Sequence, residues 1–165
     1  YVDGIPTKGK WVDLDYVTSM DDVMEDLAEA GFIPRNEDGD PEYGGDVLIA
    51  DCEGLARAFY HSRSDTMDLD DFIEARDYCD RDHVDEDAVI AYISHFGNWD
   101  QSSFEDAFSG AYDSKVAYAE ELVDDCGYLQ EMPEHLRNYF DYEAFARDLF
   151  ITDYTMVDGF VFRVV

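Results

Sequence analysis

The chain is poor in positive charge. Of its 165 residues only 11 are lysine or arginine, against 41 aspartate and glutamate, which gives a formal net charge of −30. Proteins that bind nucleic acid neutralise phosphates with lysine and arginine, so direct contact with DNA or RNA is disfavoured. Anionic membrane surfaces attract basic segments and are disfavoured for the same reason. The composition therefore favours a partner with a basic surface.

Cysteine is scarce and long apolar runs are absent. Cys52, Cys79 and Cys126 are an odd number at wide spacings, which indicates free thiols in a reducing cytoplasm rather than a disulfide framework. No stretch approaches the roughly 18 unbroken apolar residues of a membrane-spanning helix. The first residues do not begin with methionine and have neither the charged start nor the apolar run of a secretory signal. These absences predict a cytoplasmic protein.

The signatures of catalysis and of metal binding are also missing. The acid-rich stretch after Asn36 does not meet the spacing of an EF-hand calcium loop, and Cys79 with His83 lacks the second pair that a zinc site needs. There is no glycine-rich phosphate loop and no Gly-x-Ser-x-Gly nucleophile elbow. We therefore predict that the protein is not an enzyme and that it binds no cofactor or metal ion.

The apolar content nevertheless predicts a folded protein. Hydrophobic residues make up 46% of the chain and aromatic residues 15%. A disordered acidic tail lacks the aromatic and branched side chains that offset the loss of chain entropy. The acids must therefore lie on the surface of a structured domain.

Local patterns predict an α+β fold. Cap residues, apolar stripes and glycine stops mark the helices, and alternation and turn residues mark the strands. The expected elements are strands at 10–17 and 47–50, a polar loop at 35–46, helices near 19–31, 68–78, 85–97, 103–108, 114–126, 133–140 and 141–149, and hairpin arms at 149–154 and 160–165 around Asp158-Gly159. Their order predicts three small lobes in series: an α/β lobe at 1–63, a helical lobe at 64–111 and an α/β lobe with a β-hairpin at 112–165.

The carboxylates interleave with apolar residues at helical spacing. Asp68, Asp71, Glu74 and Asp77 recur every third residue, and like charges at such spacing destabilise a helix by a few tenths of a kcal/mol per pair. A surface built only for solubility has lysines between its acids. Because the repulsion among these carboxylates is not relieved in this way, we infer that the negative charge itself has a function. The candidate acidic surface comprises Asp21, Asp22, Glu25, Asp26, Glu29, Asp68, Asp70, Asp71, Glu74, Asp77, Asp80, Asp85, Glu86, Asp106, Glu120, Glu121, Asp124 and Asp125.

The amount of charge is of the order found on DNA. B-DNA carries about one charge per 1.7 Å of its axis, so the formal charge of this chain matches roughly 15 base pairs. The chain is therefore expected to imitate DNA and to occupy the DNA-binding groove of another protein. Two alternatives remain open: a protein adapted to high salt, and an acidic chaperone for histones or other basic proteins.

Two segments resemble a known family. Residues 132–149, MPEHLRNYFDYEAFARDL, resemble the signature of ArdA-type antirestriction proteins, and residues 1–14 resemble that family's N-terminal segment Tyr-x-x-Gly…Gly-x-Trp-Val/Ile-Asp. The resemblance implies elongated, curved dimers of three-lobed subunits that are encoded on mobile elements and mimic bent B-form DNA. It further implies inhibition of type I restriction–modification enzymes at the DNA site of their methyltransferase core.

The same resemblance implies an antirestriction motif near the dimer contact of the third lobe. Its residues here are Leu129, Met132, Pro133, Glu134, Leu136, Arg137, Tyr139, Phe140, Tyr142, Phe145 and Arg147. The expected packing anchors are Leu136, Tyr139, Phe140, Phe145 and Leu149. The two arginines are expected to neutralise carboxylates where acidic subunits meet. The family usually has a strand before the tyrosine that begins this chain, so either the N-terminal sheet lacks that strand or a leader has been lost.

Overall fold

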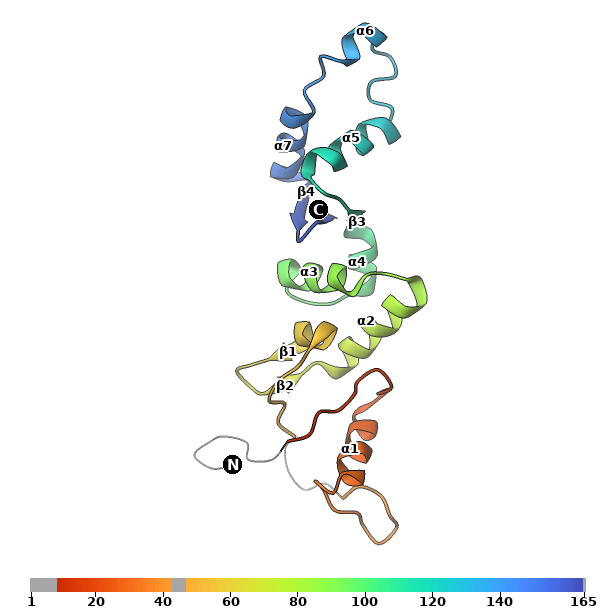
Figure 1. Ribbon diagram of the computed structural model, residues 1–165, viewed down its shortest axis with the longest axis vertical. Coiled ribbons are helices and arrows are strands. Elements are labelled where there is room, and N and C mark those ends of the chain that lie inside the picture. Colours follow the sequence, from red (N-terminus) through yellow and green to blue (C-terminus); the bar gives the residue numbers. More distant parts are fainter. Residues whose placement is uncertain (1–8, 43–46, 165) are drawn as a thin grey trace. The chain divides into compact units, whose positions relative to one another are not determined.

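The computed structural model describes residues 9–42 and 47–164, and it is α+β as predicted (Figure 1). The chain divides into two compact units, Tyr1–Glu86 and Asp87–Val165. The predicted boundaries at 63/64 and 111/112 both separate strands that pair with each other. The division into three lobes stays a prediction.

The described part of the first unit contains two α-helices, a 3-10 helix and a short hairpin. Its elements are α1 (Met20–Glu29), the 3-10 helix η1 (Gly54–Phe59), β1 (Tyr60–His61), β2 (Thr66–Met67) and α2 (Leu69–Asp82). Ser19 is the N-cap of α1, as predicted, and the Asp22 carboxylate accepts the backbone N–H of Ser19 at 3.1 Å. A carboxylate in the first turn satisfies helix N–H groups that have no partner within the helix.

The core of the first unit lies between α2 and η1. One face of α2 is buried through Leu69, Phe72, Ala75, Tyr78 and Cys79. The Phe72 ring meets that of Phe59, at the end of η1, edge to face with centroids 6.0 Å apart. Edge-to-face aromatic pairs add stabilisation beyond the area that they bury, so this contact ties the hairpin region to the helix.

Two predicted strands of the first unit are absent from the described residues. Residues 9–14 and 47–53 are irregular, so the strand predictions at 10–17 and 47–50 are wrong. Both segments are rich in β-forming residues, but β-propensity is realised only against a partner strand. The predicted loop at 35–46 is confirmed over 35–42, where it holds one isolated bridge between Arg35 and Pro41, and its last four residues lie outside the described ones.

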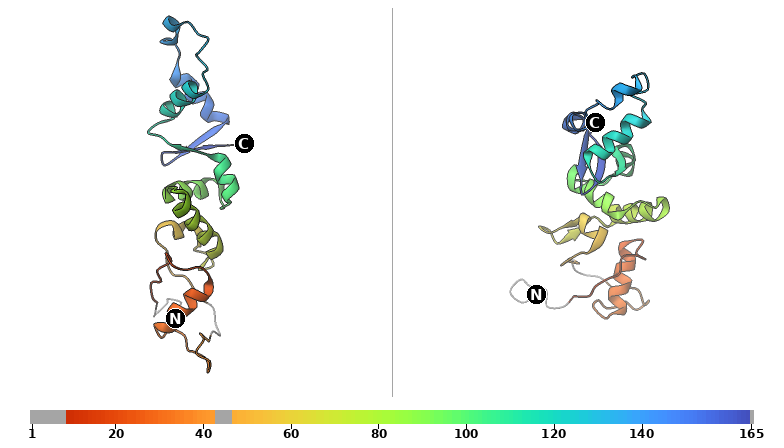
Figure 2. Two further views of the ribbon diagram at one scale, coloured as in Figure 1. Left: turned by 90° about the vertical axis from the view of Figure 1, so that its right-hand side faces the viewer. Right: turned by 45° about the horizontal axis from the view of Figure 1, so that its top comes forward.

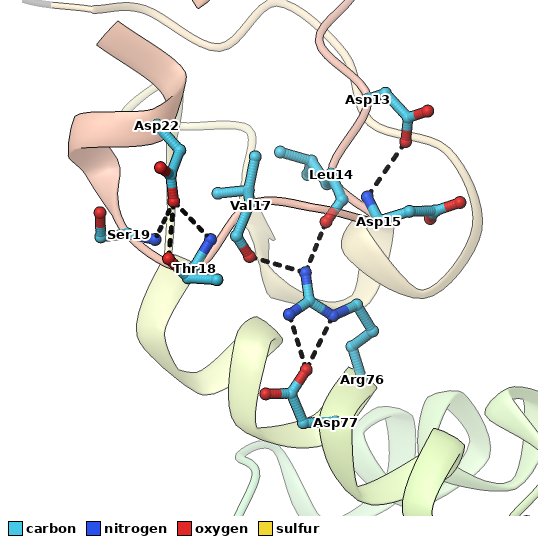
Figure 3. A network of polar contacts seen from close by, with 9 residues as sticks. All are labelled: Asp13, Leu14, Asp15, Val17, Thr18, Ser19, Asp22, Arg76 and Asp77. Carbon is cyan, nitrogen blue, oxygen red and sulfur yellow. Dashed lines mark hydrogen bonds and ion pairs between the residues drawn. The ribbon is translucent and has the colours of Figure 1, made fainter. Parts of the chain in front are cut away.

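A buried arginine takes the place of strand pairing in the segment before α1. Arg76 of α2 is 8% exposed and is the one buried charged residue of the described chain. Its Nη1 donates to the carbonyl oxygens of Leu14 at 2.6 Å and Val17 at 2.7 Å, as Figure 3 shows. Its Nε and Nη2 donate to one carboxylate oxygen of Asp77 at 3.0 and 2.6 Å. A single side chain thus fixes a segment about sixty residues away in sequence.

The second unit places helices around a three-stranded sheet. Its elements are α3 (Glu86–Phe96), α4 (Gln101–Ala107), β3 (Phe108–Ala111), α5 (Lys115–Asp125), α6 (Glu134–Arg137), α7 (Tyr142–Thr152), β4 (Tyr154–Val157) and β5 (Phe160–Arg163). The predicted cap of α7 is confirmed, because Asp141 accepts the N–H of Ala144 at 2.9 Å. Helix α5 is capped by Ser114, which accepts the N–H of Ala117 at 3.1 Å. Pro133 is the N-cap of α6 rather than its first helical residue.

The sheet has the antiparallel order β3-β5-β4. The predicted hairpin turn is confirmed, because Asp158 and Gly159 both have positive φ (50° and 90°), as a type I′ turn requires. The predicted first arm began too early, since α7 runs on to Thr152. Strand β3 was not predicted; its residue Gly110 lies at an irregularity in the pairing with β5.

Aromatic side chains fill the core of the second unit. Phe162 of β5 and Phe104 of α4 are fully buried, and their rings lie 5.7 Å and 5.3 Å from that of Tyr92 on α3. On the other side α5 packs on α7, which Figure 2 shows side by side in both views. There Tyr118 is buried against the rings of Phe150 and Tyr154, at 5.8 and 4.9 Å. No helix within the described residues is long and apolar enough to cross a membrane.

Replacing Arg76 should destabilise the first unit. In Arg76→Met the carbonyls of Leu14 and Val17 lose their charged donor, so we expect the free energy of unfolding to fall by about 2–4 kcal/mol. Urea denaturation measures the loss, and faster amide exchange over 14–19 locates it. Arg81→Met is the matched control on the same helix, because the Arg81–Asp82 pair is exposed and such pairs contribute at most about 1 kcal/mol. Equal losses in the two variants would contradict the role of Arg76.

Candidate protein-binding surface

The carboxylates predicted for the acidic surface all lie within the described residues. Sixteen of the eighteen are exposed, and Glu25 and Asp26 are half-buried. No carboxylate in residues 9–42 and 47–164 is buried. Burying an ionised carboxylate without a partner costs several kcal/mol, and the fold avoids this cost at every described position.

The acids of α1 are partly engaged in local structure. The Asp22 carboxylate accepts from both the hydroxyl and the backbone N–H of Thr18, each at 2.7 Å, and these bonds lower the pKa of Asp22. Glu25 pairs with Arg35, whose guanidinium lowers the pKa of that carboxyl. Asp26 pairs with Lys10. These three acids already have partners within the chain.

The acids of α2 lie on the side of the helix away from its buried face. Asp70, Asp71 and Glu74 are exposed, and within the described part of the chain they have no hydrogen-bond or ion-pair partner. Two neighbours do have partners: Asp77 binds Arg76, and Asp68 lies 2.7 Å from Nε2 of His61. The predicted ridge of acids on this helix is thus exposed, with its centre available to an external cation.

The second unit carries a similar group on α5. Glu120, Asp124 and Asp125 are exposed there, and Asp106 is exposed on α4. Glu121 accepts a hydrogen bond from the hydroxyl of Tyr112 at 2.9 Å. Partial burial together with this bond raises the pKa of Tyr112 to about 12, so the hydroxyl remains a donor at neutral pH.

The lysines and arginines are few in each unit and are outnumbered by acids. The first unit has 25 acidic and 7 basic residues and the second has 16 and 4, so each unit is acidic by itself. The ion pairs among described lysines and arginines are Lys10–Asp26, Arg35–Glu25, Arg76–Asp77, Arg81–Asp82 and Arg147–Asp148. Five of the basic side chains are therefore paired with acids of the same chain, and each unit keeps a net negative charge.

The motif segment is held by an arginine that binds carbonyls. Arg137 donates from Nε to the Met132 oxygen and from Nη2 to the Gln130 oxygen, both at 3.0 Å. The expectation that Arg137 and Arg147 neutralise carboxylates between subunits stays a prediction. Within one chain Arg137 instead orders the loop before α6, and Arg147 pairs with Asp148, its neighbour in sequence.

The expected apolar anchors of the motif divide into two groups. Phe140 and Phe145 have ring centroids 5.7 Å apart, and Tyr142 lies 4.8 Å from Phe140. Leu136 and Tyr139 are 44% and 83% exposed, so they are not core residues of one chain, and their role as anchors at a subunit contact stays a prediction. The remaining motif residues of this segment are exposed or half-buried: Leu129, Met132, Pro133 and Glu134.

The structure offers little for catalysis or metal binding. Over residues 9–42 and 47–164 no three metal-binding side chains come together. An open pocket of about 460 Å³ in the second unit is lined by, among others, Tyr112, Asp113, Glu121 and Asp158, and its polar lining is again mainly acidic. That the chain is no enzyme and binds no cofactor remains a prediction.

Sequence reasoning missed Arg76, which orders the N-terminal part of this surface. A signal was present, because Arg76 falls on the apolar stripe of α2, at helical spacing from Leu69, Phe72 and Cys79. A lone arginine in such a stripe predicts a buried charge with specific acceptors. Its acceptors, the carbonyls of Leu14 and Val17, carry no side-chain signal.

The sequence was compared with models of protein families and with curated proteins. A family model described as "Antirestriction protein (ArdA)" matches residues 1–162. A comparison with curated proteins found no match. The family match takes in both segments that resemble the family and the acidic helices between them. The chain belongs to the ArdA family of antirestriction proteins.

Proposed function

We propose that this protein inhibits type I restriction–modification enzymes by presenting DNA-like charge to the DNA-binding groove of their methyltransferase core. The observation that carries the proposal is that no described carboxylate is buried, although the chain has a net charge of −30. Its membership of an antirestriction family supports the choice of target. The inhibition is stoichiometric and involves no catalysis.

The mechanism is competition for cations. A DNA-binding groove holds lysines and arginines that neutralise phosphates and release counterions. Exposed carboxylates such as Asp70, Asp71 and Glu74 enter that groove without giving up partners of their own. Each contact is weak, because exposed ion pairs contribute about 0.2–1 kcal/mol. The affinity is therefore the sum of many contacts and depends on salt.

The acting species is a homodimer whose subunits meet through the motif segment. Leu136 and Tyr139 are exposed apolar side chains of the second unit, next to the loop that Arg137 orders. Apolar surface of this kind is typical of association sites. Dimerisation doubles the charge available to one groove. The protein acts in the cytoplasm, where restriction enzymes meet incoming DNA, and a mobile element that carries its gene gains from the inhibition.

A competition titration tests the proposed mechanism. Labelled target DNA is bound to a purified type I methyltransferase, and the protein is added at rising concentrations and at several salt concentrations. We expect stoichiometric displacement that weakens as salt rises, because both competitors bind through charge. Displacement that is unchanged from low to high salt would refute charge mimicry. An absence of displacement, together with binding to unrelated basic proteins, would favour an acidic chaperone.

Removing charges in groups tests whether the affinity is distributed. Single changes such as Asp71→Asn should alter the inhibition constant only about twofold. The triple variant Asp70→Asn, Asp71→Asn, Glu74→Gln should weaken inhibition about tenfold at low salt, since three exposed contacts sum to about 1.4 kcal/mol. The α5 variant Glu120→Gln, Asp124→Asn, Asp125→Asn is the matched triple in the second unit and should behave alike. If one single change abolished inhibition, a localised hot spot would replace the distributed picture.

The dimer contact is tested by placing charge on the exposed motif side chains. Leu136→Glu with Tyr139→Glu should shift the protein from dimer to monomer in sedimentation equilibrium, because like charges then face each other across the interface. Tyr16→Glu is the control, since Tyr16 is as exposed as Tyr139, at 83%, but lies in the first unit. A motif variant that remains dimeric would place the subunit contact elsewhere.

A further inference from the structure

A second group of exposed aromatic residues lies in the first unit, outside the acidic helices. Trp11 and Tyr16 are 64% and 83% exposed, and Asp13 and Asp15 between them are exposed as well. The apolar residues that alternate with them are less exposed: Val12 and Leu14 are half-buried, and Val17, which follows Tyr16, is buried. We call Trp11, Asp13, Asp15 and Tyr16 the aromatic–acidic segment.

The tip of this segment is a hydrogen-bonded turn. The N–H of Val17 donates to the Leu14 oxygen at 3.3 Å, which places Asp15 and Tyr16 at the two central positions. Just before it, the N–H of Asp15 donates to the Asp13 carboxylate at 3.0 Å. Figure 3 shows the Asp15 carboxylate directed away from Arg76. The turn therefore presents its side chains to solvent while its backbone is bonded to the protein.

The buried arginine of α2 fixes both ends of the turn. Arg76 donates to the carbonyls of Leu14 and Val17, the first and last residues of the turn. A charged group is expensive to bury, yet this one orders a turn that carries no packed side chain at its tip. Ordering an exposed turn in the free protein lowers the entropy cost of binding through that turn.

Aromatic rings beside carboxylates make a favourable site for arginine. A guanidinium forms paired hydrogen bonds to a carboxylate and stacks on an aromatic face through cation–π attraction, for which tryptophan is the best ring. Lysine offers a compact charge and no plane to stack. The aromatic–acidic segment contains both required groups next to each other in sequence.

From this combination we infer that the aromatic–acidic segment is a docking site for arginine side chains in the DNA-binding groove of the inhibited enzyme. The inference rests on the proposed function and names a contact that charge mimicry alone does not supply. Charge complementarity selects this occupant: a second copy of the chain has 11 basic residues among 41 acidic ones and is a poor source of arginines. The rings add an attraction that does not require counterion release.

The experiment compares aromatic and acidic variants in the DNA-competition titration. Tyr16→Leu with Trp11→Leu should weaken inhibition about tenfold at every salt concentration, leaving the steepness of the salt dependence unchanged. Tyr16→Phe keeps the ring and should stay within twofold of the wild type. Asp15→Asn is the matched acidic control, and it should reduce the salt dependence while having little effect at high salt.

The outcomes separate this inference from the proposed function. If the wild type displaces DNA and the aromatic double variant displaces it equally well, the inference fails and the charge mimic stands. If the wild type displaces no DNA, the proposed function fails first. A change in the sedimentation mass of the double variant would identify a second copy as the occupant and overturn the inference. Tyr16→Leu alone is the control for a folding defect, because Tyr16 is 83% exposed and its replacement should leave the urea midpoint unchanged. This single variant should lose affinity about threefold.

Discussion

Repulsion among carboxylates is the constraint to which this structure conforms. A chain with 41 acids and 11 bases can fold only if its carboxylates remain hydrated or find a donor, and the described carboxylates do one or the other. Neither unit is large, so each core must stabilise a repulsive shell with few residues. The second unit does so with closely packed rings around Phe162, because aromatic side chains bury more apolar area per residue than aliphatic ones. The high aromatic content thus offsets the repulsion that the high charge creates.

Scarce cations make the placement of each arginine consequential. Arg76 and Arg137 each donate to two backbone carbonyls. In both cases the segment has no regular structure of its own. An exposed tyrosine lies close in sequence to the bonded carbonyls, Tyr16 in the first case and Tyr128 in the second. An arginine is suited to this task, since its planar fork of donors can bind two acceptors at once. Two of the few arginines therefore order loops, and the net field is left to the acids.

The sequence predicted caps and turns, but it did not predict the pairing of segments that lie far apart in the chain. Asp141 and the Asp158-Gly159 turn act through neighbours within a few residues, so their roles could be predicted. The segments 10–17 and 47–50 have the composition of strands, yet whether they pair depends on distant residues. Strand β3 was missed for the opposite reason: Gly110 interrupts the local strand pattern, but the distant strand β5 supplies a pairing partner. The same division holds for the surface: helical spacing predicted which acids are exposed, but not which of them Arg35 or Arg76 would engage.

That last distinction bears on how binding energy is shared among the acids. Asp22 and Glu25 are already satisfied by hydrogen-bond donors in the free protein, and their lowered pKa values express that stabilisation. An arginine of a partner adds little to them unless an internal bond is broken. Asp70, Asp71 and Glu74 have no such partner among the described residues, so an external cation relieves their mutual repulsion and forms a new contact. A surface can therefore be uniformly acidic and still bind unevenly, with the acids that stabilise the fold contributing least to recognition.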